Sequence, residues 1–246
     1  MMLGASLLLA TLAMCIDPSW EDSIAALILA RGGSKGIPLK NIVELAPNET
    51  LLGRALDTVR RASVFNDVWV STDHVLIARE AEAHGARVFA RSATHAQDHS
   101  TSLEATREFL EAHPEIDRFA LIQCTSPLLR SHYLENAAHQ LSPAGPAPPP
   151  CVFSALRSYK LRWRKADLSG LLEPLNFDPK ARPRRQDWAG ELVEAGMFYF
   201  TNRRLVMDEG SFQNERCGVV EVEELDALEI DDAKDLELAR LLIALD

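Results

Sequence analysis

The stretch that most constrains this chain is residues 24–43, with the sequence IAALILARGGSKGIPLKNIV. Its first seven residues, 24–30, are continuously apolar, which is typical of a strand buried on both faces of a sheet. The following loop carries three glycines and three cations, namely Gly32, Gly33, Gly36, Arg31, Lys35 and Lys40. Glycine lets backbone amides approach a ligand closely, and amides with fixed cations form an anion-binding concavity. The stretch therefore predicts a phosphate-binding loop at the carboxyl end of a strand.

The glycine spacing by itself is a weak signal. It matches neither the dinucleotide fingerprint G-x-G-x-x-G nor the P-loop G-x-x-x-x-G-K-[ST]. A flexible surface turn with solvated lysines is the alternative interpretation of the loop. The missing dinucleotide fingerprint also argues against a dehydrogenase.

Apolar periodicity along the rest of the chain predicts alternating strands and helices. Helices are expected at 51–62, 75–84, 101–112 and 231–245, and strands at 68–71, 87–90, 119–123, 152–156, 197–201 and 217–222. Residues 71–73 are expected to end a strand and cap the next helix. This alternation predicts an α/β fold with a doubly wound, mostly parallel sheet over residues 23–246. The basic segment 154–188 is expected to form an inserted lobe, built to face an anion or an acidic partner surface.

Composition narrows the class of protein. The 246 residues carry a net charge of −10, which argues against a general nucleic-acid binder. The body of the chain has no run of ~20 apolar residues, so we expect no membrane span in the mature chain. The four cysteines fit neither a zinc site nor a disulfide framework by spacing, and we expect mostly buried thiols.

The complete string ARGGSKGIPLKNI at residues 30–42 closely resembles the first motif of the CMP-sialic acid synthetases, or CMP-N-acylneuraminate cytidylyltransferases. The resemblance is to their animal form, here without a C-terminal phosphatase-like domain. Further segments match in the same order: VSTD at 70–73, a stretch from 91 that ends in DHSTS at 98–102, IQCTSP at 122–127, and RPRRQDW at 182–188 followed by EAGMFYF at 194–200. The resemblance implies a Rossmann-like fold of the nucleotide-diphospho-sugar transferase type.

The family converts CTP and a sialic acid to CMP-sialic acid and pyrophosphate, with magnesium. The anomeric hydroxyl attacks the α-phosphorus, so the protein must align two anions and offset the charge of the leaving group. A cytidylyltransferase for another keto-sugar acid, such as KDO, is the nearest alternative function. A non-catalytic sugar-nucleotide binding protein is the alternative from another class.

The resemblance and this chemistry assign roles to particular residues. Charge on the triphosphate would be offset by Arg31, Lys35 and Lys40, with Asp231 completing the catalytic set. The nucleotide would contact Ala30, Arg31, Gly32, Gly33, Ser34, Asn41, Arg91 and Ser100. The sugar would contact Gln123, Thr125, Tyr199, Arg162 and Arg185, with Arg185 matching a family arginine that reaches a neighbouring subunit's site. Structural roles are the alternatives: an ion pair for Arg91, a helix cap for Ser100, a turn for Thr125 and a core aromatic for Tyr199.

The expected metal site departs from the family's D-I-D pattern. The matching segment is LEIDD at 228–232, and strand alternation would place Glu229 and Asp231 on one face. Magnesium, or another divalent cation such as manganese, takes carboxylate and phosphate oxygens. Glu229 is one methylene longer than aspartate, and Ala195 stands where the family has Asn. N-capping of the last helix is the alternative role for Asp231 and Asp232.

Two features predict the secretory pathway. Residues 1–22 form an apolar leader that resembles a signal peptide, although it lacks an early Lys or Arg. Asn48 opens an N-x-T sequon, the acceptor for N-glycosylation. We therefore expect a Golgi-lumen glycoprotein, with the cytoplasm or nucleus as the alternative, and a homodimer or dimer of dimers joined through the basic lobe.

Overall fold

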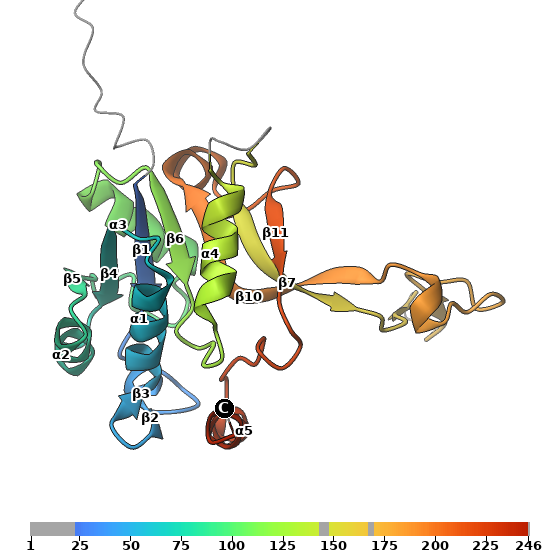
Figure 1. Cartoon of the computed structure of the whole chain (residues 1–246), viewed down its shortest axis with the longest axis horizontal. Coiled ribbons are helices and arrows are strands. Elements are labelled where there is room, and N and C mark those ends of the chain that lie inside the picture. Colours follow the sequence, from blue (N-terminus) through green and yellow to red (C-terminus); the bar gives the residue numbers. More distant parts are fainter. Residues whose placement is uncertain (1–22, 143–147, 167–169, 246) are drawn as a thin grey trace, which may run out of the picture.

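The computed structural model describes residues 23–142, 148–166 and 170–245, and a seven-stranded sheet forms its centre (Figure 1). The strand order is β11-β7-β10-β6-β1-β4-β5. The bounds are β1 Ile24–Leu29, β4 Asp67–Thr72, β5 Arg87–Ala90, β6 Arg118–Ile122, β7 Val152–Ser158, β10 Glu191–Asn202 and β11 Gly218–Glu221. Neighbouring strands pair in parallel except β10, which runs antiparallel to β6 and β7. The predicted mostly parallel sheet is confirmed.

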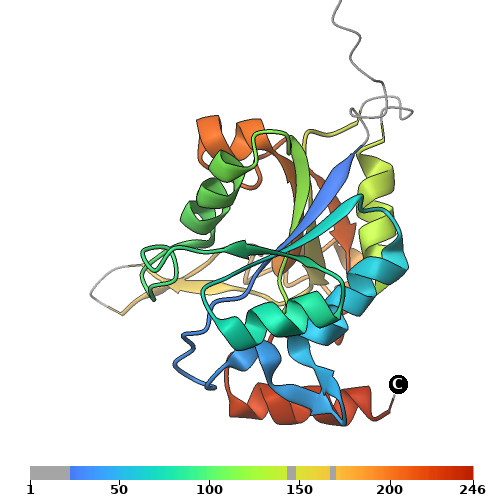
Figure 2. The same ribbon diagram turned by 90° about the vertical axis from the view of Figure 1, so that its left-hand side faces the viewer.

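Helices cover both faces of this sheet, as Figures 1 and 2 show from two directions. The helices are α1 Leu51–Ala62, α2 Val75–Ala83, α3 Ser102–Ala112, α4 Ser131–Gln140 and α5 Ala233–Ile243, with short turns η2 Lys40–Ile42, η3 Arg185–Asp187 and η4 Leu205–Glu209. α1 lies beside α2 and α4 on one face, and α3 lies beside η4 on the other. On β1, Ala26 and Ile28 face the first layer, and Ala25 and Leu27 face the second. Burial on both faces explains why this strand is continuously apolar.

α5 packs beneath the sheet against the loop that follows β1. Its contacts are with a small hairpin, β2 Glu44–Ala46 and β3 Glu49–Thr50, and its buried Leu236 joins Ile37 and Leu45 in a separate apolar cluster. This packing holds the C-terminal part of the chain close to the predicted phosphate loop. None of the described helices is long and apolar enough to cross a lipid bilayer.

Three local features differ from the sequence-based expectations. Helix α4 was not predicted, because it is largely polar and buries only Tyr133, Leu134 and Ala137. The N-cap of α2 is His74 rather than a residue in 71–73, since its ring nitrogen accepts the Leu76 amide at 3.3 Å. The leader and residues 143–147 of the proline-rich connection lie outside the described residues.

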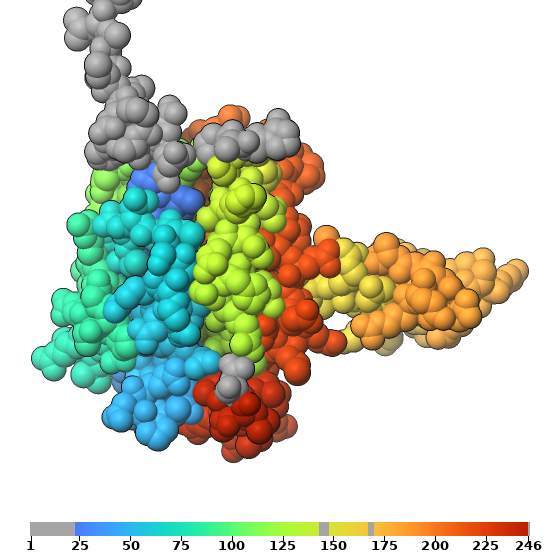
Figure 3. Space-filling view, viewed as in Figure 1, coloured from blue at the N-terminus to red at the C-terminus, as the bar shows by residue number. Residues whose placement is uncertain are grey.

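An arm extends from the sheet between β7 and β10 (Figures 1 and 3). The outer halves of β7 and β10 form its base, and a hairpin of β8 Trp163–Lys165 and β9 Leu172–Pro174 extends it. Many of its arginines are paired within the chain: Arg157 with Glu221, Arg162 with Glu191, Arg164 with Glu173 and Arg184 with Asp187. These four guanidinium groups are therefore already paired with carboxylates of the same chain, and the expectation that this segment faces an anion or an acidic partner stays a prediction.

The expectation of free thiols is wrong for two of the cysteines. Cys151 and Cys217 form a disulfide, whereas Cys124 is a buried free thiol as predicted. The two bonded residues are 66 positions apart in sequence, and the pairing of β7 with β11 brings them together. Sequence spacing could not reveal this contact because it depends on which strands are neighbours.

Candidate active site

A cavity of about 290 Å³ lies where the loops after β1, β5 and β6 meet. Nine residues assigned to the site from the sequence line it: Arg31, Ser34, Lys35, Lys40, Asn41, Arg91, Ser100, Gln123 and Thr125. Gly36 of the predicted loop also lines it, as do His95, Thr101 and Ser102, to which no role was assigned from the sequence. The cavity lies outside the carboxyl ends of parallel strands, the usual ligand position in an open α/β sheet.

Hydrogen bonds fix the shape of the loop after β1. The Gly32 amide donates to Asp73 Oδ1 at 2.8 Å, and Asn41 Nδ2 donates to the Arg31 carbonyl at 2.9 Å. Asn41 is buried, and its Oδ1 accepts from the Cys124 thiol at 3.0 Å. Asn41, predicted to contact nucleotide, is thus engaged in holding the loop. Preorganised in this way, the loop can meet an anion without first being ordered.

Two of the loop cations already hold a carboxylate. Arg31 NH1 lies 2.7 Å from Asp98 Oδ1, and Lys35 Nζ lies 2.9 Å from Asp98 Oδ2. The Lys35 ammonium, followed by the Arg31 guanidinium, holds the pKa of Asp98 below its usual value. Sequence reasoning missed Asp98, although it opens the DHSTS motif. Both cations therefore point at one acidic group, as a phosphate would require.

Arg91 is buried at the side of the cavity. Its Nε donates to Ser71 Oγ at 3.0 Å, and its NH2 donates to the Ser71 carbonyl at 2.7 Å. Burial lowers the pKa of Arg91 to about 10, so the side chain remains a cation at neutral pH. Ser100 precedes the capping residue of α3, and its hydroxyl lies 3.4 Å from Glu104 Oε2. Both residues line the cavity as predicted and also make structural contacts.

Carboxylates of the segment before α5 lie next to Lys40. Lys40 Nζ donates to the Ile230 carbonyl at 2.7 Å and lies 3.6 Å from Asp231 Oδ1. The Thr125 hydroxyl donates to Glu229 Oε1 at 3.2 Å. Partial burial, and then the Asp231 charge, raise the pKa of Glu229. Two carboxylates thus flank one lysine beside the cavity.

This segment is not a strand, so the predicted alternation is wrong. Residues 228–231 are irregular, and the Ile230 amide donates to the Thr125 carbonyl at 2.9 Å. Glu229 and Asp231 are nevertheless close enough for the Asp231 charge to act on Glu229. In the described part of the chain, no three His, Cys, Asp or Glu side chains gather as a metal site. A metal bound here would need ligands from the substrate as well.

Tyr199, which is predicted to contact the sugar, lies on β10 where the pairing of that strand with β7 becomes irregular. The Tyr199 hydroxyl donates to Glu194, and burial together with that carboxylate raises the pKa of Tyr199. Gln213 Nε2 donates to the other Glu194 oxygen at 2.6 Å. The register of β10 against β7 shifts between Glu194 and Tyr199, which a continuous strand prediction could not show.

Four other predicted residues, Ala30, Gly33, Arg162 and Arg185, do not line the cavity. Ala30 is fully buried behind the loop, and Gly33 is exposed. Arg162 is on the arm with Glu191, and the Arg185 guanidinium lies 4.8 Å from the centre of the Tyr159 ring. The structure therefore does not bring these two arginines to the cavity of their own chain.

Known proteins resemble this chain in sequence. A family model described as cytidylyltransferase matches residues 25–243. N-acylneuraminate cytidylyltransferase A of Danio rerio is 44% identical over 210 residues, which are 85% of this chain and 48% of that protein. The N-acylneuraminate cytidylyltransferase of Oncorhynchus mykiss is 44% identical over 77% of this chain and 44% of its own length. The chain thus spans about half the length of these fish relatives.

Solved structures share the fold at low sequence identity. A CMP:2-keto-3-deoxy-manno-octonic acid synthetase complexed with CTP has a TM-score of 0.65 at 18% identity, over 91% of this chain and 99% of that one. A 4-diphosphocytidyl-2C-methyl-D-erythritol synthase from Anaerococcus prevotii has a TM-score of 0.64 at 16% identity, over 91% and 96% of the two chains.

Proposed function

Because this chain belongs to the cytidylyltransferase family, we propose that it transfers CMP from CTP to the anomeric hydroxyl of a sialic acid. The products are CMP-sialic acid and pyrophosphate. The observation that carries the proposal is the cavity at residues 31–41, where the motif shared with the sialic acid enzymes presents its cations. The 44% identity to fish N-acylneuraminate cytidylyltransferases supports the choice of sugar.

In the reaction, the anomeric oxygen forms a bond to the α-phosphorus while the bond from that phosphorus to the bridging oxygen breaks. The hydroxyl proton is lost and pyrophosphate leaves. Arg31 and Lys35 exchange Asp98 for phosphate oxygens, which offsets the charge that grows on the leaving group. Lys40, which also lines the cavity, adds a third positive charge. The chain's contribution is alignment and charge, and no covalent intermediate is needed.

Glu229 and Asp231 would hold a divalent cation, magnesium or manganese. The chemistry of the donors fits, because hard carboxylate oxygens with substrate phosphates are the usual magnesium ligands. Burial, and then the Asp231 charge, raise the pKa of Glu229, and a cation bound by the two carboxylates would offset both effects. Such a cation supplies additional charge neutralisation at the phosphates.

The test is a pyrophosphate-release assay on the purified chain with CTP. A panel of sialic acids, KDO and a related nonulosonate identifies the sugar, and magnesium and manganese are compared. Release with a sialic acid at the highest kcat/KM supports the proposal. Preference for KDO would contradict the choice of sugar, and CTP binding without turnover under any condition would contradict an enzyme.

We propose further that the protein is a homodimer, itself able to pair into a dimer of dimers. The arm of residues 157–190 exposes apolar side chains, with Trp163 46% and Leu172 61% exposed, and it carries Arg162 and Arg185 away from the local cavity. A second subunit would cover the apolar surface and receive Arg185 near its sugar site. Light scattering should give twice the monomer mass of 27.3 kDa. A fully active monomer at the assay concentration contradicts the dimer.

The proposed location is the Golgi lumen, where CMP-sialic acid would serve sialyltransferases. Asn48 is exposed at the turn between β2 and β3, which suits glycan attachment. The full chain should shift in gel mobility on treatment with an N-glycan-removing enzyme, and Asn48→Gln should abolish the shift. An unshifted protein with diffuse cytosolic staining contradicts this location.

A further inference from the structure

We propose that the disulfide between Cys151 and Cys217 is a covalent clamp of the mature protein, closed by a thiol–disulfide oxidant. It stabilises the edge of the sheet and takes no part in turnover. The proposal does not rest on the proposed reaction, because its evidence lies at the amino ends of β7 and β11. The active-site cavity lies at the opposite ends of the parallel strands.

The fold places the two cysteines directly opposite one another. Val152 pairs with Gly218 as the first step of the β7–β11 ladder, and the cysteines are the residues just before them. The Gly218 amide donates to the Cys151 carbonyl at 2.8 Å, and the two Cα atoms are 4.6 Å apart. That separation is within the range that a disulfide requires. A Cβ on Gly218 would lie 2.4 Å from Gln140 Oε1, so glycine leaves room for the Gln140 side chain, whose Nε2 donates to the Val219 carbonyl at 3.1 Å.

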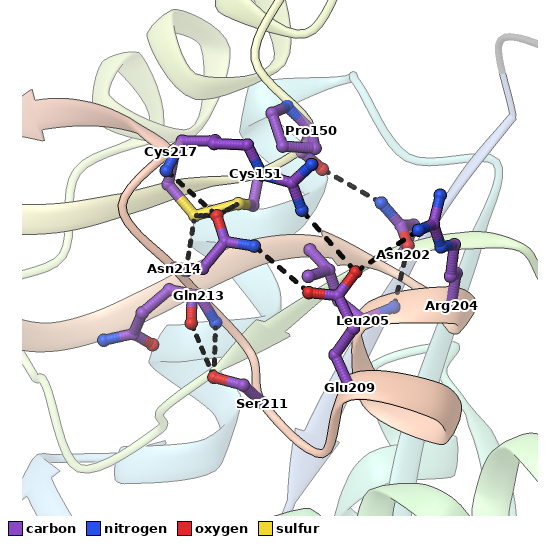
Figure 4. Close-up of polar contacts among 11 residues, drawn as sticks. Pro150, Cys151, Asn202, Arg204, Leu205, Glu209, Ser211, Gln213, Asn214 and Cys217 are labelled. Atoms are coloured by element: carbon purple, nitrogen blue, oxygen red, sulfur yellow. Dashed lines mark hydrogen bonds and ion pairs between the residues drawn. A yellow bond between two sulfur atoms is a disulfide. The ribbon is translucent and has the colours of Figure 1, made fainter.

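Polar contacts hold both cysteine segments without help from the sulfur–sulfur bond (Figure 4). The Asn214 amide donates to Cys217 Sγ at 3.1 Å, and Asn214 Nδ2 donates to Glu209 Oε2 at 3.3 Å. On the other side, Asn202 Nδ2 donates to the Pro150 carbonyl at 3.0 Å. The two thiols therefore remain neighbours in the reduced chain, which favours closure of this bond over other pairings.

The clamp joins a short edge strand to the sheet. In the described part of the chain, β11 has four residues and pairs with β7 alone. Downstream, Asp226 accepts from the Tyr133 hydroxyl at 2.8 Å and from Arg130 Nε at 3.0 Å. These bonds anchor the chain between β11 and the carboxylates of Glu229 and Asp231. Opening the disulfide should therefore loosen the edge strand and leave the active site in place.

Accessibility determines how the bond forms. Cys217 is partly exposed and Cys151 is fully buried. The Cys217 thiolate attacks a sulfur of the oxidant's disulfide and releases one thiol; the Cys151 thiolate then attacks Cys217 Sγ and releases the second. Two protons and two electrons pass from the cysteines to the oxidant. Cys124 does not compete, because it is buried and burial raises its pKa to about 12.

The first test maps the bond in the full chain purified from secretory cells. After alkylation in denaturant without reductant, proteolysis should yield one peptide pair linked through Cys151 and Cys217. Alkylation of both residues would overturn the proposal. Protein made in a reducing cytosol should gain the link on incubation with glutathione disulfide, with a loss of two hydrogens in mass.

The second test separates stability from turnover. A clamp over 66 residues should raise the melting temperature by about 10 °C. Reductant should remove that increment from the wild type and leave kcat with CTP at 25 °C within about twofold. The matched control, Cys151→Ala with Cys217→Ala, should melt near the reduced wild type and not respond to reductant. An unchanged wild-type melting temperature in reductant contradicts a clamp, and a parallel loss of kcat contradicts its separation from catalysis.

Discussion

Replacing Lys40 by methionine tests the link between the phosphate loop and the carboxylate segment. The substitution keeps most of the side-chain stem, which is only 17% exposed, and removes the charge and the donor. It deletes the 2.7 Å hydrogen bond to the Ile230 carbonyl and the 3.6 Å ion pair with Asp231. Two effects should follow, one on stability and one on turnover.

The stability effect comes from the charged hydrogen bond to the Ile230 carbonyl. Such bonds are worth about 1.5–3 kcal/mol, and each kcal/mol moves the melting temperature of a chain this size by about 2–4 °C. The Lys40→Met melting temperature should therefore fall by about 3–12 °C. The turnover effect comes from the lost preorganised cation, which predicts a ~100-fold or larger fall in kcat/KM for CTP, or about 2.7 kcal/mol.

The dependence on pH adds a third readout. The Lys40 charge acts to lower the pKa of Glu229, which burial and Asp231 have raised. Without that charge the Glu229 pKa rises further, so the acid side of the rate profile should move to higher pH. The comparison variant is Lys35→Met, which removes another cation from the same cavity. Lys35 is 81% exposed and pairs with Asp98, so its loss should leave the melting temperature unchanged.

Stopped assays of pyrophosphate across pH, together with differential scanning fluorimetry, supply all three readouts. A folded Lys40→Met protein whose kcat/KM stays within about threefold of the wild type would falsify the catalytic role. If Lys40→Met has a lowered melting temperature but a wild-type pH–rate profile, the role of Lys40 is structural only.

Three further predictions concern the acidic side chains. Asp231→Asn should weaken binding of divalent metal, measured by calorimetry, and move the acid limb of the rate profile to lower pH, because the Asp231 charge raises the Glu229 pKa. Glu229→Asp restores the family's spacing and should keep or improve turnover with magnesium; a large loss would show that the longer side chain is required. Asp98→Asn frees Arg31 and Lys35, so KM for CTP should fall severalfold at low salt, and an unchanged KM would show that Asp98 does not compete with substrate.

The sequence predicted the strands and helices best where burial is one-sided or complete. The limits of α1 match expectation to the residue because its apolar spacing is regular; those of β5 also match, although its four residues are half-buried or exposed. Helix α4 escaped prediction because three buried side chains give little periodicity. The disulfide escaped because only the pairing of β7 with β11 brings Cys151 to Cys217.

In the site, too, the sequence predicted residues of a local motif and missed contacts that depend on the fold. A motif could identify Arg31, Lys35 and Lys40, since their function depends on a continuous loop. It could not identify Asp98 as the partner of Arg31 and Lys35, because the contact of Arg31 with Asp98, across 67 positions, is set by the fold. Asn41 lines the cavity, and its buried side chain also holds the loop, a second role that a motif does not reveal.

Charges in the free site are already paired, and this constrains how the substrate enters. Asp98 neutralises Arg31 and Lys35, and Asp231 lies beside Lys40. In the proposed reaction, the phosphates of CTP would take the place of these carboxylates instead of meeting bare cations. Because the Lys35 side chain is 81% exposed and the Asp98 side chain 44% exposed, this exchange costs little free energy, which agrees with the severalfold fall in KM expected for Asp98→Asn. The chain has a net charge of −10, and its cations gathered and held at this cavity allow an acidic protein to present a site that suits a polyanion.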